Sequence, residues 1–434
     1  MPRAGWTKPV SDRRLSDLVS VGVLTRVFPP ALVDEVVAAS GRREQRNRTL
    51  PARVMTYFAV GMALHAEGSY EDVLSQLSDG LSWSAAAAGG GRGDGDGDDE
   101  VVAAGSVALP SKSAIFQARA RLGSEPVRAL FERVAVPLAQ PGTPGAWLAG
   151  RRLVAVDGMC LDVPDTVVNE GFFGRPGVAK GERAAFPMAR VVALAECATH
   201  AVFAARVGAY TDSEPTLIEQ LLTSFGPGMV VLADRGVFSF ALWRTATATG
   251  ADLLWRIRTD PLGPRPVHVR DLPDGSWLAH LRKSTDRHSE PMLVRVVDYT
   301  LDDGRRAGAQ HPGHPGDAPP ARSYRLFTTI TDPAQASATD LADAYRQRWE
   351  IETTFDELKT HQRGPRAVLR SKSPDLVLQE IWGHLCCHYA IRTLMSDTAA
   401  HTAHRGHDPD RVSFVAALRI ARQSLAGTQG GFPP

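Results

Sequence analysis

Four side chains suited to phosphate or metal chemistry recur at fixed spacing in residues 340–362, DLADAYRQRWEIETTFDELKTHQ. Tyr345, Arg348, Glu352 and Lys359 are separated by three, four and seven residues. At about 100° per residue they lie within about 60° of one another on a helix. An apolar stripe beside them would dock this helix on a core. The spacing predicts one long helix with a carboxylate, two bases and a hydroxyl on one face. A solvated face with an incidental Arg–Glu pair remains the alternative.

Two aspartates follow short apolar runs that are typical of buried strands. Asp157 follows RRLVAV, and Asp234 follows MVVLA. In open α/β sheets ligands bind at the carboxyl ends of strands, although a single aspartate there is as often a turn residue. Together with Glu352 they offer three carboxylates, which are hard ligands that select Mg²⁺ or Mn²⁺. Two such ions, about 3.5–4 Å apart, would activate a water or a 3′-hydroxyl and stabilise the leaving oxygen of a phosphodiester.

Three stretches carry a resemblance to a known family. They are LVAVDGMCLDVPDTVVN, VVLADRGVFS and YRQRWEIETTFDELK, the last of which fits the signature Y-x2-R-x3-E-x6-K without a mismatch. The sequence resembles the DDE transposases of bacterial insertion sequences, specifically the insertion-element-four family. The likeness is strong at these motifs and extends in outline over residues 35–390.

The resemblance implies roles for the motif residues. It implies catalytic, metal-binding roles for Asp157, Asp234 and Glu352, which would hold two Mg²⁺ or Mn²⁺ ions. The flanking motif residues Tyr345, Arg348 and Lys359 would then contact the DNA backbone. Asp162 and Asp165 lie close to Asp157 in the sequence. We prefer Asp157 because it directly follows the apolar run and matches the motif.

The order of elements predicts an α/β fold. From residue 151 the expected order is strand, strand, strand, helix, strand, helix, strand, which is similar to the RNase-H-like mixed sheet of such enzymes, with helices on both faces. We expect an N-terminal helical, DNA-binding domain at 1–140 and a catalytic domain at 150–260 plus 335–395. A β-rich insertion would lie at 261–334, before the last catalytic helix, and a C-terminal helical segment at 396–434.

Two further regions bear on DNA binding. Residues 84–105 hold one Arg and five acidic residues, a net charge of −4, in a low-complexity stretch expected to be a flexible loop. Residues 106–152 are basic, and a helix carrying Arg119 and Arg121 could lie against DNA phosphate or could simply be solvated. Trp277 in the insertion could stack on an unpaired base, although hairpin packing is the more common role of such a residue.

Composition limits the possible classes. Hydrophobic residues make up 43% and charged residues 22%, which excludes a wholly disordered chain. The formal net charge is +1, so whole-chain charge argues neither for nor against a nucleic-acid partner. Four cysteines suit a reducing cytosol, and the sequence shows neither a signal peptide nor an apolar run of about 18 residues. We expect a cytoplasmic, nucleoid-associated protein with no membrane partner.

Three functions remain open from the sequence. The first is an active transposase that binds terminal inverted repeats and target DNA, as a homodimer on double-stranded DNA. The second is a catalytically silent, transposase-derived repressor that binds DNA through its basic region. The third is a stand-alone metal-dependent nuclease. The intact set of three carboxylates favours the first over the second.

Overall fold

The structure is a computed structural model of the chain. It describes residues 22–46, 48, 50–77, 110–177, 183–282, 290–301, 322–364, 368–401 and 412–426. The acidic loop expected at 84–105 lies outside the described residues.

The centre of the fold is a ten-stranded mixed sheet. Its strands are β1 Trp147–Leu148, β2 Arg151–Asp162, β3 Met188–Glu196, β4 Val202–Ala209, β5 Met229–Ala233, β6 Asp252–Ile257, β7 Val267–Asp271, β8 Trp277–Leu281, β9 Met292–Leu301 and β10 Arg322–Thr328. The order across the sheet is β4-β3-β2-β5-β6-β10-β9-β8-β7, with β1 paired to β2. Among the described strands, the parallel pairings are β2 with β5 and β5 with β6, and all other neighbours pair antiparallel. The chain is therefore a mixed α/β protein.

The expected order of elements from residue 151 is present, with one added helix, α8, between β2 and β3. The expectation that the first strand ends at Asp157 is wrong. β2 continues to Asp162, because its antiparallel partner β3 pairs with it through Asp162, whereas its parallel partner β5 ends at Ala233. Asp157 therefore lies within a strand, at the point where one of its two neighbours stops.

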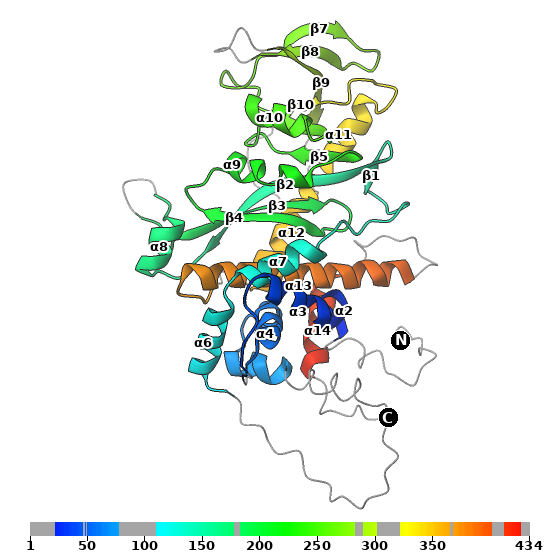
Figure 1. The fold of residues 1–434 in the computed structure, drawn as a ribbon. Coiled ribbons are helices and arrows are strands. Elements are labelled where there is room, and N and C mark those ends of the chain that lie inside the picture. Colours follow the sequence, from blue (N-terminus) through cyan, green and yellow to red (C-terminus); the bar gives the residue numbers. More distant parts are fainter. Residues whose placement is uncertain are drawn as a thin grey trace, which may run out of the picture.

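The β-rich region at 261–334 continues the central sheet. β10 pairs antiparallel with β6, with Phe327 opposite Trp255, and β9, β8 and β7 follow outward. These strands lie at one end of the molecule in Figure 1. The expected β-rich insertion therefore begins at residue 261 in the sequence, but its strands belong to the same sheet as those before it.

Helices lie on both faces of the sheet. In order they are α2 Gly22–Val27, α3 Pro30–Ala39, α4 Ala52–Leu64, α6 Lys112–Leu122, α7 Glu125–Val134, α8 Val167–Phe173, α9 Glu214–Glu219, α10 Phe240–Thr247, α11 Ala338–Arg346, α12 Trp349–Asp356, α13 Pro374–His401 and α14 Phe414–Ala426. Successive residues of a strand point to opposite faces. Asp157 faces α12, where it meets Arg348, whereas the Cα of Gly158 lies against Glu214 of α9.

The long helix α13 lies between the sheet and the N-terminal helices (Figure 1). It packs on α2, α4, α7 and α14 on one side and contacts β4 on the other. One hydrophobic core runs through both layers, from Leu24 in α2 to Ala421 in α14. Within the described residues, no helix combines the length and apolar character needed to cross a membrane.

Candidate active site

The two strand aspartates are neighbours in space. Val156 of β2 pairs with Ala233 of β5 in parallel register. Asp157 and Asp234, the residues that follow them, therefore lie side by side. Their carboxylates are partly shielded, with 22% of the Asp157 side chain and 34% of the Asp234 side chain exposed. The sequence prediction that these two residues converge is consistent with this register.

The guanidinium of Arg348 bridges two of the predicted carboxylates. Its Nη1 lies 3.3 Å from Asp157 Oδ2, and its Nη2 donates to Glu352 Oε1 at 2.9 Å. Only 5% of the Arg348 side chain is exposed, whereas the Glu352 side chain is 45% exposed at the rim. Arg348 therefore ties the helix that carries Glu352 to the strand that carries Asp157.

The predicted long helix is interrupted at this arginine. α11 ends at Arg346, α12 begins at Trp349, and a π-helical turn follows at Glu357–Gln362. The amides of Gln347 and Arg348 bond to carbonyls three residues earlier, which tightens the chain between the two helices. Short 3₁₀ stretches and π-turns inside helices are typical of functional sites. The expectation of one continuous helix over 340–362 is thus wrong.

Tyr345 is buried beside the second aspartate. Its hydroxyl lies 3.4 Å from Asp234 Oδ1 and 3.4 Å from the carbonyl oxygen of Ala233. The same carboxylate oxygen also lies near Arg256, whose Nη1 is 3.6 Å from Asp234 Oδ1. Because Tyr345 is 4% exposed and faces the carboxylate, the structure does not place it against a DNA backbone as the sequence predicted. Its position is that of a residue that orients Asp234.

Burial and neighbouring groups act on the pKa of Asp157 in both directions, and the net shift is upward. Burial raises the pKa of Asp157 to about 6, and nearby Glu214 and Asp234 act in the same direction. The amide of Gly158 and the charge of Arg348 oppose this shift. A buried carboxylate with a raised pKa beside a second carboxylate is the electrostatic pattern expected of a functional site.

Lys359 and one atom of Arg348 have no described partner within the protein. Among the described residues no carboxylate pairs with Lys359, which is half-buried beyond Glu352 in the π-helical turn. The Nε of Arg348 is buried, and no described group accepts its hydrogen bond. A phosphate oxygen is the acceptor that such a guanidinium N–H prefers.

The predicted DNA-contact role of Arg119 is wrong for this structure. Arg119 is fully buried in α6, where it donates to Tyr70 Oη at 2.6 Å, Gln379 Oε1 at 2.9 Å and Ser371 Oγ at 3.1 Å. Burial lowers the pKa of its guanidinium. Helical spacing contains the missed signal, because Arg119 lies on the same stripe as the buried Ile115 and Leu122.

The other two proposed contacts are partly engaged within the protein. Arg121 is half-buried and donates to the carbonyl of Leu50 at 3.1 Å. Trp277 lies in the β7–β8 hairpin, where its ring stacks on His268 with centroids 5.5 Å apart. This is the hairpin packing that the sequence left open as the alternative to base stacking.

The chemistry of the donors fits a divalent cation, but the arrangement is not that of a loaded site. Asp157, Asp234 and Glu352 supply the hard oxygen ligands that such ions prefer. No three His, Cys, Asp or Glu side chains of the described chain are already grouped around one point in metal-binding geometry. The reason is visible in the contacts, because the charge of Arg348 occupies the place between Asp157 and Glu352.

Sequence reasoning missed two residues that border the carboxylates. Arg256 pairs with Asp234 and lies in β6. In the sequence it is a polar residue in a largely apolar strand, and nothing there links it to Asp234. Trp349 directly follows Arg348, is 58% exposed, and has the Arg348 guanidinium over its ring at 5.3 Å. The position of Trp349 beside the signature arginine was a signal available in the sequence.

Comparison with known proteins identifies the class. The family model described as "Transposase DDE domain" matches residues 148–390, and the model "Insertion element 4 transposase N-terminal" matches residues 18–132. The chain is 30% identical over 407 residues to "Transposase InsG for insertion sequence element IS4" of Escherichia coli (strain K12), covering 93% of this chain and 83% of that protein. It is 29% identical over 148 residues to "Putative transposase InsZ" of the same organism, covering 34% and 49%.

One solved structure, described as a "piggyBac transposase synaptic complex with hairpin DNA", aligns at a TM-score of 0.43 and 10% identity over 94% of this chain and 82% of that chain. The two family models together define the class as DDE transposases. This chain belongs to the insertion element 4 family of that class and is a DNA transposase. Membership of the DDE class implies dependence on divalent metal ions.

Proposed function

We propose that the protein binds the terminal inverted repeats of an insertion sequence and carries out metal-dependent strand cleavage and strand transfer there. One observation carries this proposal. Asp157 and Asp234 lie side by side on parallel strands, and Glu352 lies across the Arg348 guanidinium from Asp157. We further propose that the sheet from β4 to β6 is RNase-H-like, as its antiparallel hairpin followed by parallel strands supports.

Asp157, Asp234 and Glu352 are the proposed metal ligands. Two Mg²⁺ or Mn²⁺ ions held there would activate the attacking water or 3′-hydroxyl and stabilise the leaving oxygen. Arg348 holds Glu352 through Oε1, and the other carboxylate oxygen of this side chain, which is 45% exposed at the rim, is left for an ion. Tyr345 and Arg256 both contact Oδ1 of Asp234, which favours one orientation of its carboxylate.

The proposed DNA contacts follow from the groups left free. The ammonium of Lys359 is available to a backbone phosphate, whereas the buried Nε of Arg348, which has no described acceptor, would meet a phosphate only if the side chain moved outward. We propose that the N-terminal helices within 1–140, including Arg121, add DNA contacts, and that two copies act together on paired ends at the nucleoid. For Trp277, contact with an unpaired base would require the β7–β8 hairpin to open.

Incubation of the full chain with Mg²⁺ and a duplex carrying the element's own inverted repeats tests the proposal. We expect nicks at the repeat ends and joining of those ends to a second duplex, both lost in EDTA. Cleavage without joining would indicate a nuclease, and binding without cleavage in Mg²⁺ or Mn²⁺ would indicate a silent DNA-binding protein. Either result would contradict the proposed strand transfer.

A further inference from the structure

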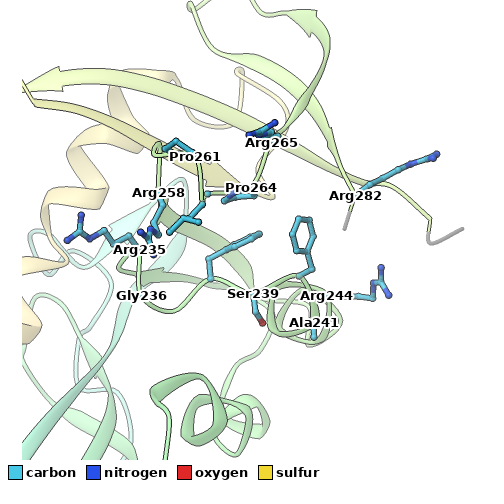
Figure 2. Close-up of a pocket in the computed structure, with 14 residues that line it drawn as sticks. Arg235, Gly236, Ser239, Ala241, Arg244, Arg258, Pro261, Pro264, Arg265 and Arg282 are labelled. Atoms are coloured by element: carbon cyan, nitrogen blue, oxygen red, sulfur yellow. The ribbon is translucent and has the colours of Figure 1, made fainter. Parts of the chain in front are cut away.

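A large basic pocket opens immediately beyond Asp234. Its volume is about 1140 Å³, and its walls come from the β5–α10 connection, from helix α10 and from the turn that precedes β7 (Figure 2). Among the residues that the structure describes, five arginines and no acidic residue line it: Arg235, Arg244, Arg258, Arg265 and Arg282. Arg235 directly follows Asp234, so the pocket begins where the candidate active site ends.

Most of this charge is not neutralised by the protein. Arg258 pairs with Asp260 at 2.8 Å. Within the part of the chain that the structure describes, the other four guanidiniums have no carboxylate partner, and all four are exposed. Like charges gathered in one concavity repel one another, so the arrangement is stabilised by a polyanion that enters it.

One wall of the pocket is rigid. Gly263 donates its amide to the carbonyl of Asp260 at 2.9 Å, and a Cβ at this position would lie 2.1 Å from the Arg258 carbonyl oxygen. Prolines at 261, 264 and 266 restrict the same turn. The turn presents Leu262 to solvent with 81% exposure and holds Arg258 and Arg265 at the pocket edge. Such a wall binds without a large ordering cost.

The chemistry of the lining selects phosphate on a polymer. Arginine binds phosphate bidentately, and the N-terminal end of α10, capped by Ser239, adds backbone N–H groups from a second side. Phe238 and Phe240 add apolar surface to the lining. The volume exceeds the roughly 300–1,000 Å³ typical of small-ligand pockets. A chain of phosphates uses several arginines at once, whereas a small anion uses one or two.

We propose that this pocket binds the sugar–phosphate backbone of a DNA strand as it passes Asp234. The inference rests on the proposed function, because it assigns a second contact to the DNA that reaches the active site. Two sources supply the same chemistry: the strand at the end of the element, and the target duplex. The pocket binds one of these two DNAs, and the experiment distinguishes between them.

The test uses the full chain with Arg244→Gln and Arg265→Gln combined, and Arg270→Gln as the matched control. Arg270 is an exposed arginine on β7 outside the pocket. Affinity for inverted-repeat duplex and for an unrelated target duplex is measured across a salt series without divalent metal. We expect the double variant to lower the salt slope by about two units in one of the two arms, close to one unit for each lost phosphate contact. Arg270→Gln should leave both slopes unchanged.

A second pair of variants adds charge without removing an arginine. Leu262→Glu places a carboxylate at the exposed edge of the pocket and should weaken the same arm, whereas Leu262→Gln should not. A change with inverted-repeat duplex assigns the pocket to the element's end, and a change with target duplex assigns it to target DNA. Unchanged slopes and affinities in both arms for the double variant and for Leu262→Glu would overturn the proposal.

These measurements need no cleavage. If the chain does not cleave DNA with metal ions, the salt slopes of the pocket variants still show whether the pocket binds DNA. If the pocket does not bind DNA, cleavage by the wild-type chain is unaffected. The two proposals are therefore tested separately.

Discussion

Asp157 and Arg348, 191 positions apart in the sequence, lie 3.3 Å apart at the centre of the candidate site. The same guanidinium holds Glu352 at 2.9 Å. Three carboxylates near one another would repel, and the charge of the arginine offsets part of that repulsion. Arg348 is therefore a brace between strand and helix.

The brace predicts that the geometry of Arg348 matters as well as its charge. Arg348→Lys keeps one positive charge but cannot reach Asp157 and Glu352 with two separate nitrogens. We expect single-turnover cleavage to fall at least about tenfold, because Glu352 is no longer held at a fixed place beside the aspartates. Rapid-quench measurement of strand nicking at saturating protein checks this rate.

Lys359→Ala provides the contrast to the arginine variant. Lys359 has no described carboxylate partner, so its loss should lower the salt slope of end binding by about one unit and leave the rate of nicking in the bound complex nearly unchanged. Equal cleavage rates for wild type and Arg348→Lys would show that the bridge between Asp157 and Glu352 has no catalytic role.

The raised pKa of Asp157 predicts a particular pH dependence without metal. Its pKa of about 6 lies above the ordinary value of 3.8, so the folded chain binds the proton more tightly than the unfolded chain. Stability in EDTA should therefore fall as pH rises from about 4 to 6, by at most about 3 kcal/mol for roughly two pKa units. Thermal unfolding followed by circular dichroism across this range should show the fall, and Asp157→Asn should remove it.

Metal binding should reverse this effect, because a cation stabilises the ionised carboxylate. We expect Mg²⁺ to raise the melting temperature at pH 7 more than at pH 5, and cleavage to slow about tenfold per pH unit below about 6. Asp165→Asn is the control, since Asp165 is exposed and paired with Arg175. An identical response to Mg²⁺ in Asp157→Asn would exclude Asp157 as a ligand.

The burial of Arg119 predicts a structural phenotype. Arg119→Ala removes a fully buried side chain and leaves the groups of Tyr70, Gln379 and Ser371 without their donor, which should cost about 3–5 kcal/mol. Arg121→Ala, which loses one bond to the carbonyl of Leu50, should cost at most about 1 kcal/mol. Urea unfolding of both variants measures the difference. If Arg119→Ala were as stable as wild type and its DNA binding depended less steeply on salt, Arg119 would be a DNA-contact residue after all.

A buried charge network under the active-site helix predicts acid sensitivity. Glu357 pairs with Arg392, and its Oε2 lies 3.0 Å from His388 Nε2. Burial opposes the charge of Glu357, but hydrogen bonds with His200 and His388 and the charge of Arg392 outweigh it and lower its pKa. This stabilisation is present above the ordinary pKa of 4.5 and is lost as pH falls below it.

Glu357→Gln should therefore destabilise the fold at pH 7 by about 3–5 kcal/mol, because it breaks the buried ion pair between Glu357 and Arg392. The variant should also lose less stability than wild type between pH 5 and pH 3. Chemical denaturation at these pH values measures both effects. If the variant lost as much stability as wild type between pH 5 and pH 3, Glu357 would not govern acid stability.

The sequence predicted the strands that carry the aspartates better than it predicted how the carboxylates are held. The apolar runs before Asp157 and Asp234 define parallel strands, and the structure aligns them in register. Helical spacing placed Arg348 and Glu352 on one face but could not show which neighbour that face meets. Asp157 lies 191 positions from Arg348, and only the folded sheet brings the two together.

Errors in the sequence analysis arose where local pattern and tertiary contacts disagree. An apolar run ending in Asp and Gly suggests a strand end, yet β3 extends the pairing of β2 to Asp162. Charge suggested exposure for Arg119, yet its helical spacing puts it on the buried stripe of α6. The basic pocket escaped notice because its arginines are spread from 235 to 282 and gather only when the turn before β7 folds against α10.

The central claim is that Asp157, Asp234 and Glu352 act as one metal-dependent catalytic unit. The most direct measurement is Mg²⁺-dependent nicking of inverted-repeat duplex by Asp157→Ala, Asp234→Ala and Glu352→Ala, with Asp165→Ala as the matched control and end binding measured in parallel. The account predicts that each of the three loses nicking and keeps end binding, since binding rests mainly on phosphate contacts elsewhere, while the control cuts like wild type. Mg²⁺-dependent nicking at the wild-type rate by any one of the three would contradict it.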